Sequence, residues 1–215
     1  GRRIFYAASH HYGHLGSVVT RYDTRTGLAF YRDNPLPDQQ IMSLVYDRPT
    51  DSLLCGTTCD ADCRSVPPST HDTFIARLDA DTLKVKRKTK GPAGSNGASI
   101  IGPLGQGRFL GTCTGTFADG ASGARWFAFD PAGFRTPELA EVHALDGWSG
   151  GILYGNRPGI FVLHVGPRIE VWDLCKPRRI KVLGDSIHIS SFFVQERDVL
   201  IWTAWDVFVL ENALV

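Results

Sequence analysis

A turn containing Asp recurs four times along this chain of 215 residues. Each copy has an aromatic or apolar residue, then Asp, then a turn that leads into an outer strand. The Asp residues are 56, 51 and 43 residues apart, at Asp23, Asp79, Asp130 and Asp173. The Asp has a local purpose, because its carboxylate can accept backbone N–H bonds two residues further on and so close the turn. A repeat of this length indicates an array of similar small units.

A second motif recurs upstream of three of these turns and once more near the C-terminus. It consists of an apolar strand, a tight polar turn and another apolar strand. Its copies begin at Ile41, Ala98, Gly150 and Ile189, and the run Ile4–Ala8 matches its second strand. Together the two motifs give four strands in each unit of roughly 40–50 residues. We therefore predict an all-β fold, a β-propeller of four-stranded antiparallel blades.

The predicted blades form one array over residues 1–215. Three are complete, at 39–94, 95–147 and 148–186, and two are partial, at 1–38 and 187–215. With strands named a to d, the first blade has b, c and d and the last has a, b and c, which makes eighteen strands. An open ring exposes two sheet edges. We expect four to five blades of a larger ring, completed by the remainder of a longer chain or by a partner subunit; a five-bladed ring with two thin blades is the alternative.

The inner strand pair of the second blade carries the residues that suggest a family. The first strand of this pair has Ile41, Leu44 and Asp47, and the second has Leu54, Gly56 and Thr57. With the aromatic-Asp turns, these features resemble the bacterial-type β-propeller superfamily. The resemblance implies fold more than activity, because that superfamily includes lyases, glycosidases, lectin-like binders and scaffolds. The WD40 and kelch patterns are not met.

Loop lengths indicate where a site would lie. Because blade strands alternate in direction, the b–c and d–a loops share one face, and the b–c loops are long in the first three blades only. Long loops on a rigid scaffold commonly carry function. We therefore predict a binding site on this face over the first three blades, with the d–a loops at the rim of a central channel. The predicted binding residues are Tyr12, Asp38, Gln39, Gln40, Asn96, Trp148 and His188.

The first two b–c loops also carry residues that suit catalysis or metal binding. Imidazole and carboxylate groups suit Zn or Mn, and His suits proton transfer. The candidates for a catalytic base are His10, His11, His14 and His71. The candidates for a divalent-metal site are His10, His14, Asp60, Asp62, His71 and Asp72. The simpler interpretation is a polar surface loop, since the adjacent His10 and His11 would point to opposite sides of an extended segment.

The cysteines favour a structural interpretation. Their number is five, which does not fit a dense disulfide framework. The spacing of Cys59 and Cys63 does not match a zinc finger or ribbon. Cys55 and Cys113 are expected to be buried core thiols. A loop disulfide between Cys59 and Cys63 stays open.

A basic segment, 84–90, has five Lys or Arg residues among seven. It falls on the predicted outermost strand of the second blade, where Lys protects an exposed edge from pairing. The chain as a whole carries 23 basic and 22 acidic residues. This balance disfavours a polyanion binder, so nucleic acid is not an expected partner.

These observations predict a ligand-binding or interaction module for a glycan or a protein. The alternative is a propeller-type polysaccharide lyase or hydrolase with a His base, with or without a divalent metal. No P-loop or dinucleotide motif is present. No leader and no apolar run of transmembrane length are visible in this chain, so we expect a soluble protein and assign no compartment.

Overall fold

The strands of a computed structural model of the chain follow the repeats. The structure describes residues 2–10, 13–60, 66–140, 148–154, 157–165, 167–176, 178–185, 191–195, 198–202 and 206–214. These residues form eighteen strands, the number that the repeats predict, and one short 3-10 helix, η1 (Arg48–Thr50). No helix in this described part is long and apolar enough to cross a membrane.

The chain divides into two compact units. Unit 1 comprises Gly1–Ile100 and Leu110–Ala140, and unit 2 comprises Ile101–Phe109 and Glu141–Val215. The sequence predicts one array of blades over residues 1–215. This continuous array stays a prediction, and each unit is described by itself.

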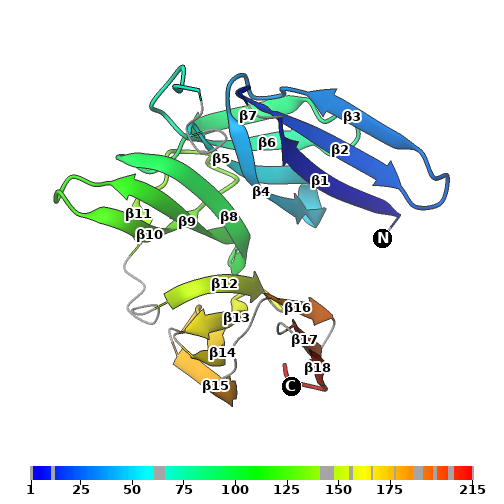
Figure 1. Ribbon diagram of the computed structural model, residues 1–215, viewed down its shortest axis with the longest axis vertical. Coiled ribbons are helices and arrows are strands. Elements are labelled where there is room, and N and C mark those ends of the chain that lie inside the picture. Colours follow the sequence, from blue (N-terminus) through cyan, green and yellow to red (C-terminus); the bar gives the residue numbers. More distant parts are fainter. Residues whose placement is uncertain are drawn as a thin grey trace. The chain divides into compact units, whose positions relative to one another are not determined.

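Unit 1 holds the first three strand sets (Figure 1). The first sheet has the order β1-β2-β3. The second blade has β4 to β7, and the third has β8 to β11. The bounds are β1 (Arg3–Ser9), β2 (Ser17–Asp23), β3 (Ala29–Asp33), β4 (Gln40–Asp47), β5 (Ser52–Thr58), β6 (Phe74–Asp79), β7 (Val85–Lys90), β8 (Ser95–Gly105), β9 (Arg108–Thr116), β10 (Ser122–Phe129) and β11 (Leu139–Ala140).

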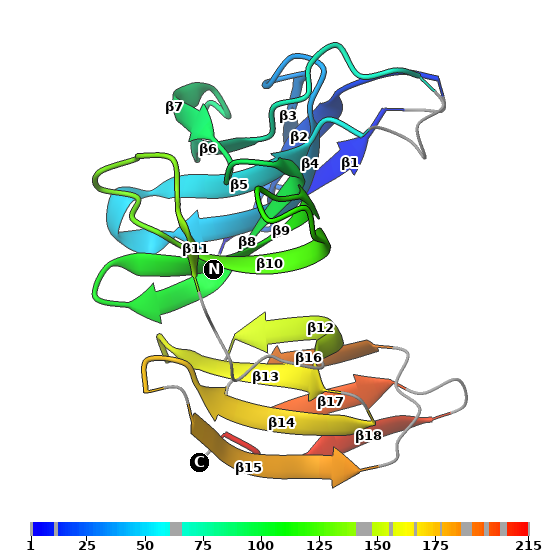
Figure 2. The same ribbon diagram turned by 90° about the vertical axis from the view of Figure 1, so that its left-hand side faces the viewer.

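Unit 2 holds the last two strand sets together with the tip of the β8–β9 hairpin. The fourth blade is a four-stranded sheet in the order β12-β13-β14-β15, and the last sheet has the order β16-β17-β18. Figure 2 shows the two sheets within this unit. The bounds are β12 (Trp148–Tyr154), β13 (Ile160–Val165), β14 (Arg168–Asp173), β15 (Arg178–Asp185), β16 (Ser191–Gln195), β17 (Asp198–Trp202) and β18 (Val207–Leu210).

Sequence-consecutive strands pair within each set, as in the blade of a β-propeller. The chain therefore has the predicted all-β, propeller-type fold. One feature differs from separate blades: the second and third sets join into a single eight-stranded sheet. They join at one pair, Thr58 of β5 opposite Gly97 of β8. The two strands approach closely here because glycines at this junction have no side chains.

The Asp turns form as predicted in all four copies. Each Asp carboxylate accepts N–H bonds from the residues two and three positions on. The bond from the residue two positions on measures 2.8 Å at Asp23, 3.0 Å at Asp79, 2.8 Å at Asp130 and 3.0 Å at Asp173. The four Asp turns are therefore one structural device, repeated.

Asp79 is the most strongly held of these carboxylates. It accepts bonds from Lys86 and from the backbone and hydroxyl of Thr82, and these bonds hold its pKa well below its usual range. A carboxyl whose pKa is lowered on folding stabilises the fold above its unfolded pKa, about 4, and loses that effect as the pH falls through the folded pKa.

We expect Asp79→Ala to lower the free energy of unfolding by about 1–2 kcal/mol at pH 7, because several hydrogen bonds to a charged but partly solvated group are lost. Urea unfolding at a series of pH values measures this. The gap between variant and wild type should narrow as the pH falls below about 4, because the carboxyl of the unfolded wild-type chain takes up its proton there while the folded carboxyl stays charged to lower pH. A gap that is the same at pH 7 and at the lowest pH would contradict the assigned role.

The cysteine and lysine predictions are confirmed where the structure describes them. Cys55 and Cys113 are buried, and burial raises the pKa of the Cys55 thiol to about 12 and that of Cys113 to about 11. Cys63 lies outside the described residues, and with it the Cys59–Cys63 pairing. The strand β7 is the end strand of its sheet, and Lys86 and Lys90 on it form ion pairs with Asp79 and Asp72.

Candidate binding site

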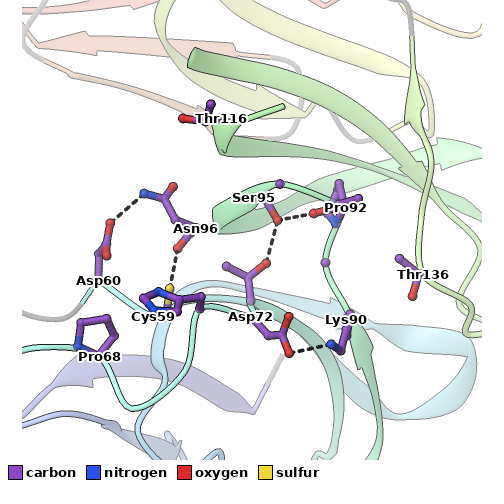
Figure 3. A pocket seen from close by; sticks show the side chains of 15 residues that line it. Cys59, Asp60, Pro68, Asp72, Lys90, Pro92, Ser95, Asn96, Thr116 and Thr136 are labelled. Atoms are coloured by element: carbon purple, nitrogen blue, oxygen red, sulfur yellow. Dashed lines mark hydrogen bonds and ion pairs between the residues drawn. The ribbon is translucent and has the colours of Figure 1, made fainter. Parts of the chain in front are cut away.

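The described residues of unit 1 form a cavity of about 820 Å³ at the loop ends of β5, β6 and β8 (Figure 3). Both ends of the second b–c loop contribute, with Asp60 at its start and His71 and Asp72 at its end. The opposite wall is the d–a loop that leads from Lys90 to Asn96. This is the loop face that the sequence predicts for a site.

Asn96 is the central side chain of this site. Its Nδ2 donates to Asp60 Oδ2 at 2.7 Å, and its Oδ1 accepts from Thr114 Oγ1 at 3.2 Å. Its backbone carbonyl accepts from Thr58 Oγ1 at 2.6 Å. One residue thus ties the end of β5, the b–c loop and β9 together. An amide has two donors and two acceptor lone pairs, and these partners use one of each.

The d–a loop is held by a buried hydroxyl pair. Thr73 Oγ1 and Ser95 Oγ lie 2.8 Å apart, and Ser95 Oγ donates to the carbonyl of Pro92 at 2.6 Å. Both side chains are buried. The loop that presents Asn96 is therefore fixed by internal bonds before any ligand arrives.

Among the described lining residues, the carboxylates are Asp60 and Asp72 and the ammonium group is Lys90. Lys90 Nζ lies 2.7 Å from Asp72 Oδ2, so this pair is neutral together. Phosphate and carboxylate ligands favour clustered Arg or Lys, and the described lining offers one paired Lys.

A second cavity, of about 830 Å³, shares Asp60, Asn96 and Thr116 with the first. Gln40 and Met42, at the start of β4, also line it. The Asp60–Asn96 pair therefore contributes to the lining of both hollows.

Some of the predicted site residues line one of the two cavities, and others line neither. Asp60, His71, Asp72 and Asn96 come together at the first cavity, and Gln40 lies at the second. Asp38 and Gln39 line neither. Gln39 is buried and accepts from Thr57 Oγ1 at 2.7 Å, so it supports the loop from within.

The histidines of the first loop lie elsewhere. His10 Nε2 is 2.8 Å from Asp33 Oδ1, at the end of β3, and neither His10 nor His14 lines either of these two cavities. Among those residues, no three His, Cys, Asp or Glu side chains are placed to hold a metal ion. His11, Tyr12, Asp62 and His188 lie outside the described residues, as does the side chain of Trp148.

Several site residues escape prediction from the sequence, chiefly Thr58 and Thr114. A signal for them does exist. Both are the seventh residue of an inner b strand, β5 (Ser52–Thr58) and β9 (Arg108–Thr116), near the end that leads into its long loop. The repeat alignment could have marked this position as the one that bonds to the d–a loop.

Comparisons with known proteins give information on the fold of this chain and not on its activity. No family model and no curated protein matches the chain. Hydrazine synthase of Kuenenia stuttgartiensis is similar in structure, with a TM-score of 0.67 at 11% identity, over 100% of this chain and 70% of that one. A functionally unknown protein from Desulfotomaculum acetoxidans has a TM-score of 0.51 at 13% identity, over 89% of this chain and 58% of that one. The β-propeller domain of the trilobed protease from Pyrococcus furiosus has a TM-score of 0.49 at 12% identity, over 99% of this chain and 76% of that one.

Identities this low carry no information on activity. The likeness to bacterial-type propeller repeats rests on the repeat residues alone and stays a prediction.

Proposed function

We propose that this chain is a β-propeller binding module whose ligand is a neutral, hydroxyl-rich molecule, in the first place a glycan. The ligand would bind in the first cavity, against Asn96 and Asp60. The observation that carries the proposal is the Asn96 side chain, held at 2.7 Å by Asp60 and at 3.2 Å by Thr114, with a donor and a lone pair beyond these partners.

The chemistry of the lining supports a neutral ligand. Carboxylate and amide groups accept and donate to sugar hydroxyls without a net charge on the ligand. For a phosphate or uronate group the described lining offers one Lys, and that Lys is already paired with Asp72. A protein ligand is the second source of such chemistry, and it would present Ser, Thr or backbone groups to the same side chains.

The lyase or hydrolase alternative takes second place. It needs a His base close to the substrate and a cation for the developing charge. His71 lines the cavity, but Lys90, the cation of the described lining, is paired with Asp72. A uronate would have to break that pair, whereas a neutral glycan would not.

A glycan array with neutral and acidic members tests the proposal on the whole chain. We expect neutral glycans to bind, and Asn96→Ala to weaken binding at least tenfold, which corresponds to about 1.4 kcal/mol and to roughly one lost hydrogen bond. Gln106→Ala is the matched control, since it removes an amide in the β8–β9 turn, outside both cavities. Circular dichroism of each variant establishes that it is folded.

Three outcomes would overturn the assignment: binding of acidic glycans only, equal affinity of the Asn96→Ala variant and wild type, or an equal loss in the control. Turnover of a uronate glycan would favour the lyase instead.

A further inference from the structure

The second cavity lies beside the first, and the two share part of their lining. Asp60, Asn96 and Thr116 line both. The bond from Asn96 Nδ2 to Asp60 Oδ2, drawn in Figure 3, therefore belongs to both hollows. Each cavity has a volume within the range of about 300–1,000 Å³ that is usual for ligand pockets. A ligand bound to Asn96 in the first cavity thus lies next to a second hollow of similar size.

The second cavity lies between the second and third blades, within unit 1. Gln40 and Met42 come from the start of β4, and other lining residues come from the end of β9 and the start of β10. Met42 follows Ile41, which packs in the core cluster with Val19 of the first sheet. Because side chains alternate along a strand, Met42 points to the other side of β4. The described lining thus comes from residues 40–124, away from the two partial blades.

The polar groups of the second cavity suit a neutral ligand. Among its described lining residues, Asp60 alone carries a charge. Thr116 Oγ1 and Ser122 Oγ lie 2.8 Å apart, and the bond between them uses one of their two O–H donors. Hydroxyl and amide groups donate to and accept from sugar hydroxyls without a charge on the ligand. The hydroxyl groups are those of Thr58, Thr114, Thr116 and Ser122, and the amides are those of Gln40 and Asn96.

Met42 and Ala124 add apolar surface to this cavity. The side chain of Met42 is 53% exposed, and Ala124 is exposed near the start of β10. A thioether side chain is flexible and polarizable, so it adapts to the shape of what it contacts. A sugar ring presents C–H groups on its faces and hydroxyl groups around its edge. The second cavity therefore offers a contact for each part of a sugar ring.

We propose that the glycan is a chain of at least two sugars, with one unit in the first cavity and the next in the second. This inference rests on the proposed function, which supplies the class of ligand, and it adds the length that the site recognises. The two units would meet at the Asp60–Asn96 pair. Binding of the first unit brings the second to its cavity at a high effective concentration, so affinity rises with chain length until both cavities are filled.

Isothermal titration calorimetry with neutral sugars of increasing length tests the inference on the whole chain. The probes are glucose, maltose and maltotriose, then cellobiose and cellotriose, and then mannose, mannobiose and mannotriose. We expect at least one series to bind at least tenfold more tightly with two or three units than with one. Met42→Ala removes an apolar contact, and Ala124→Leu fills part of the second cavity. Each should bring this ratio of affinities close to one.

Leu28→Ala is the matched control, because it removes an exposed apolar side chain outside both cavities and should keep the wild-type ratio. Circular dichroism establishes that each variant is folded, and either cavity variant suffices for the test. Equal affinity for one and three units would overturn the inference and leave the proposed function in place. So would a wild-type ratio in the folded cavity variants. Binding of none of these sugars would overturn the glycan assignment and the inference together.

Discussion

Replacing Gly56 with Ala is expected to lower the free energy of unfolding by about 3 kcal/mol, at the top of the usual range for overpacking. A Cβ at this position would lie 2.3 Å from the carbonyl oxygen of Ala98 and 2.9 Å from the Cα of Ser99. Both obstacles are backbone atoms of β8, so no rotamer change relieves the clash. The second and third blades would have to separate at the Thr58–Gly97 pair that joins them.

Gly120→Ala is the matched control for this experiment. Gly120 has φ +77 with open space around its Cβ position, so its replacement tests backbone conformation alone, at about 1 kcal/mol. Urea unfolding followed by circular dichroism measures both variants. If Gly56→Ala and Gly120→Ala lost the same unfolding free energy, the close approach of the strands would not be what holds the two blades together. Because Asn96 is bonded to the end of β5 at the same junction, Gly56→Ala should also weaken ligand binding.

Glu170→Ala is the second large effect, expected to cost about 2 kcal/mol of unfolding free energy. The side chain is 1% exposed. Its Oε1 accepts from Arg179 Nη1 at 3.1 Å and forms an ion pair with Arg168 Nε at 3.1 Å, and its Oε2 accepts from Trp172 Nε1 at 2.7 Å. Hydrogen bonds to a charged group contribute about 1.5–3 kcal/mol each. The two Arg side chains are more than a third exposed and regain water, which reduces the sum.

Glu170→Gln keeps the shape and an acceptor for Trp172, so it should lose about half as much as Glu170→Ala. Glu211→Ala, an exposed carboxylate in the same unit, should change stability by less than about 0.5 kcal/mol. Thermal or urea unfolding of the three variants measures how much unfolding free energy each one loses and so ranks them. A loss from Glu170→Ala no larger than that from Glu211→Ala would show that the buried charge is not stabilised by its partners.

Local chemistry explains what the sequence predicts well. The Asp turns need only residues two and three positions apart, and the a and b strands of each complete blade are joined by a short turn. Lys86 and Lys90 fall on an end strand because the alternation of the repeat places them there. These features depend on residues that are close together in the chain, and the copies of the repeat can be compared with one another.

Long-range contacts explain what the sequence does not predict. His10 lies after β1, and its partner Asp33 ends β3, two strands away, so the pair follows from the sheet register. Asn96 meets Asp60 and Thr114 because the second and third blades join next to it, at the Thr58–Gly97 pair. Glu170 is a different case, because Arg168 and Trp172 lie two residues away on its own strand and Arg179 lies on the next strand. It occupies the position of Ala76 and Phe127 in the other repeats, so the repeat does not predict a buried carboxylate there.

Hydrogen–deuterium exchange of the whole chain, with and without a glycan that binds it, tests the central claim most directly. The account predicts slower exchange in the peptides that cover 58–60, 91–96 and 114–116, and unchanged exchange in the β8–β9 turn at Gly105–Gly107. Protection confined to unit 2, or to the His10 loop, would contradict the placement of the site at Asn96.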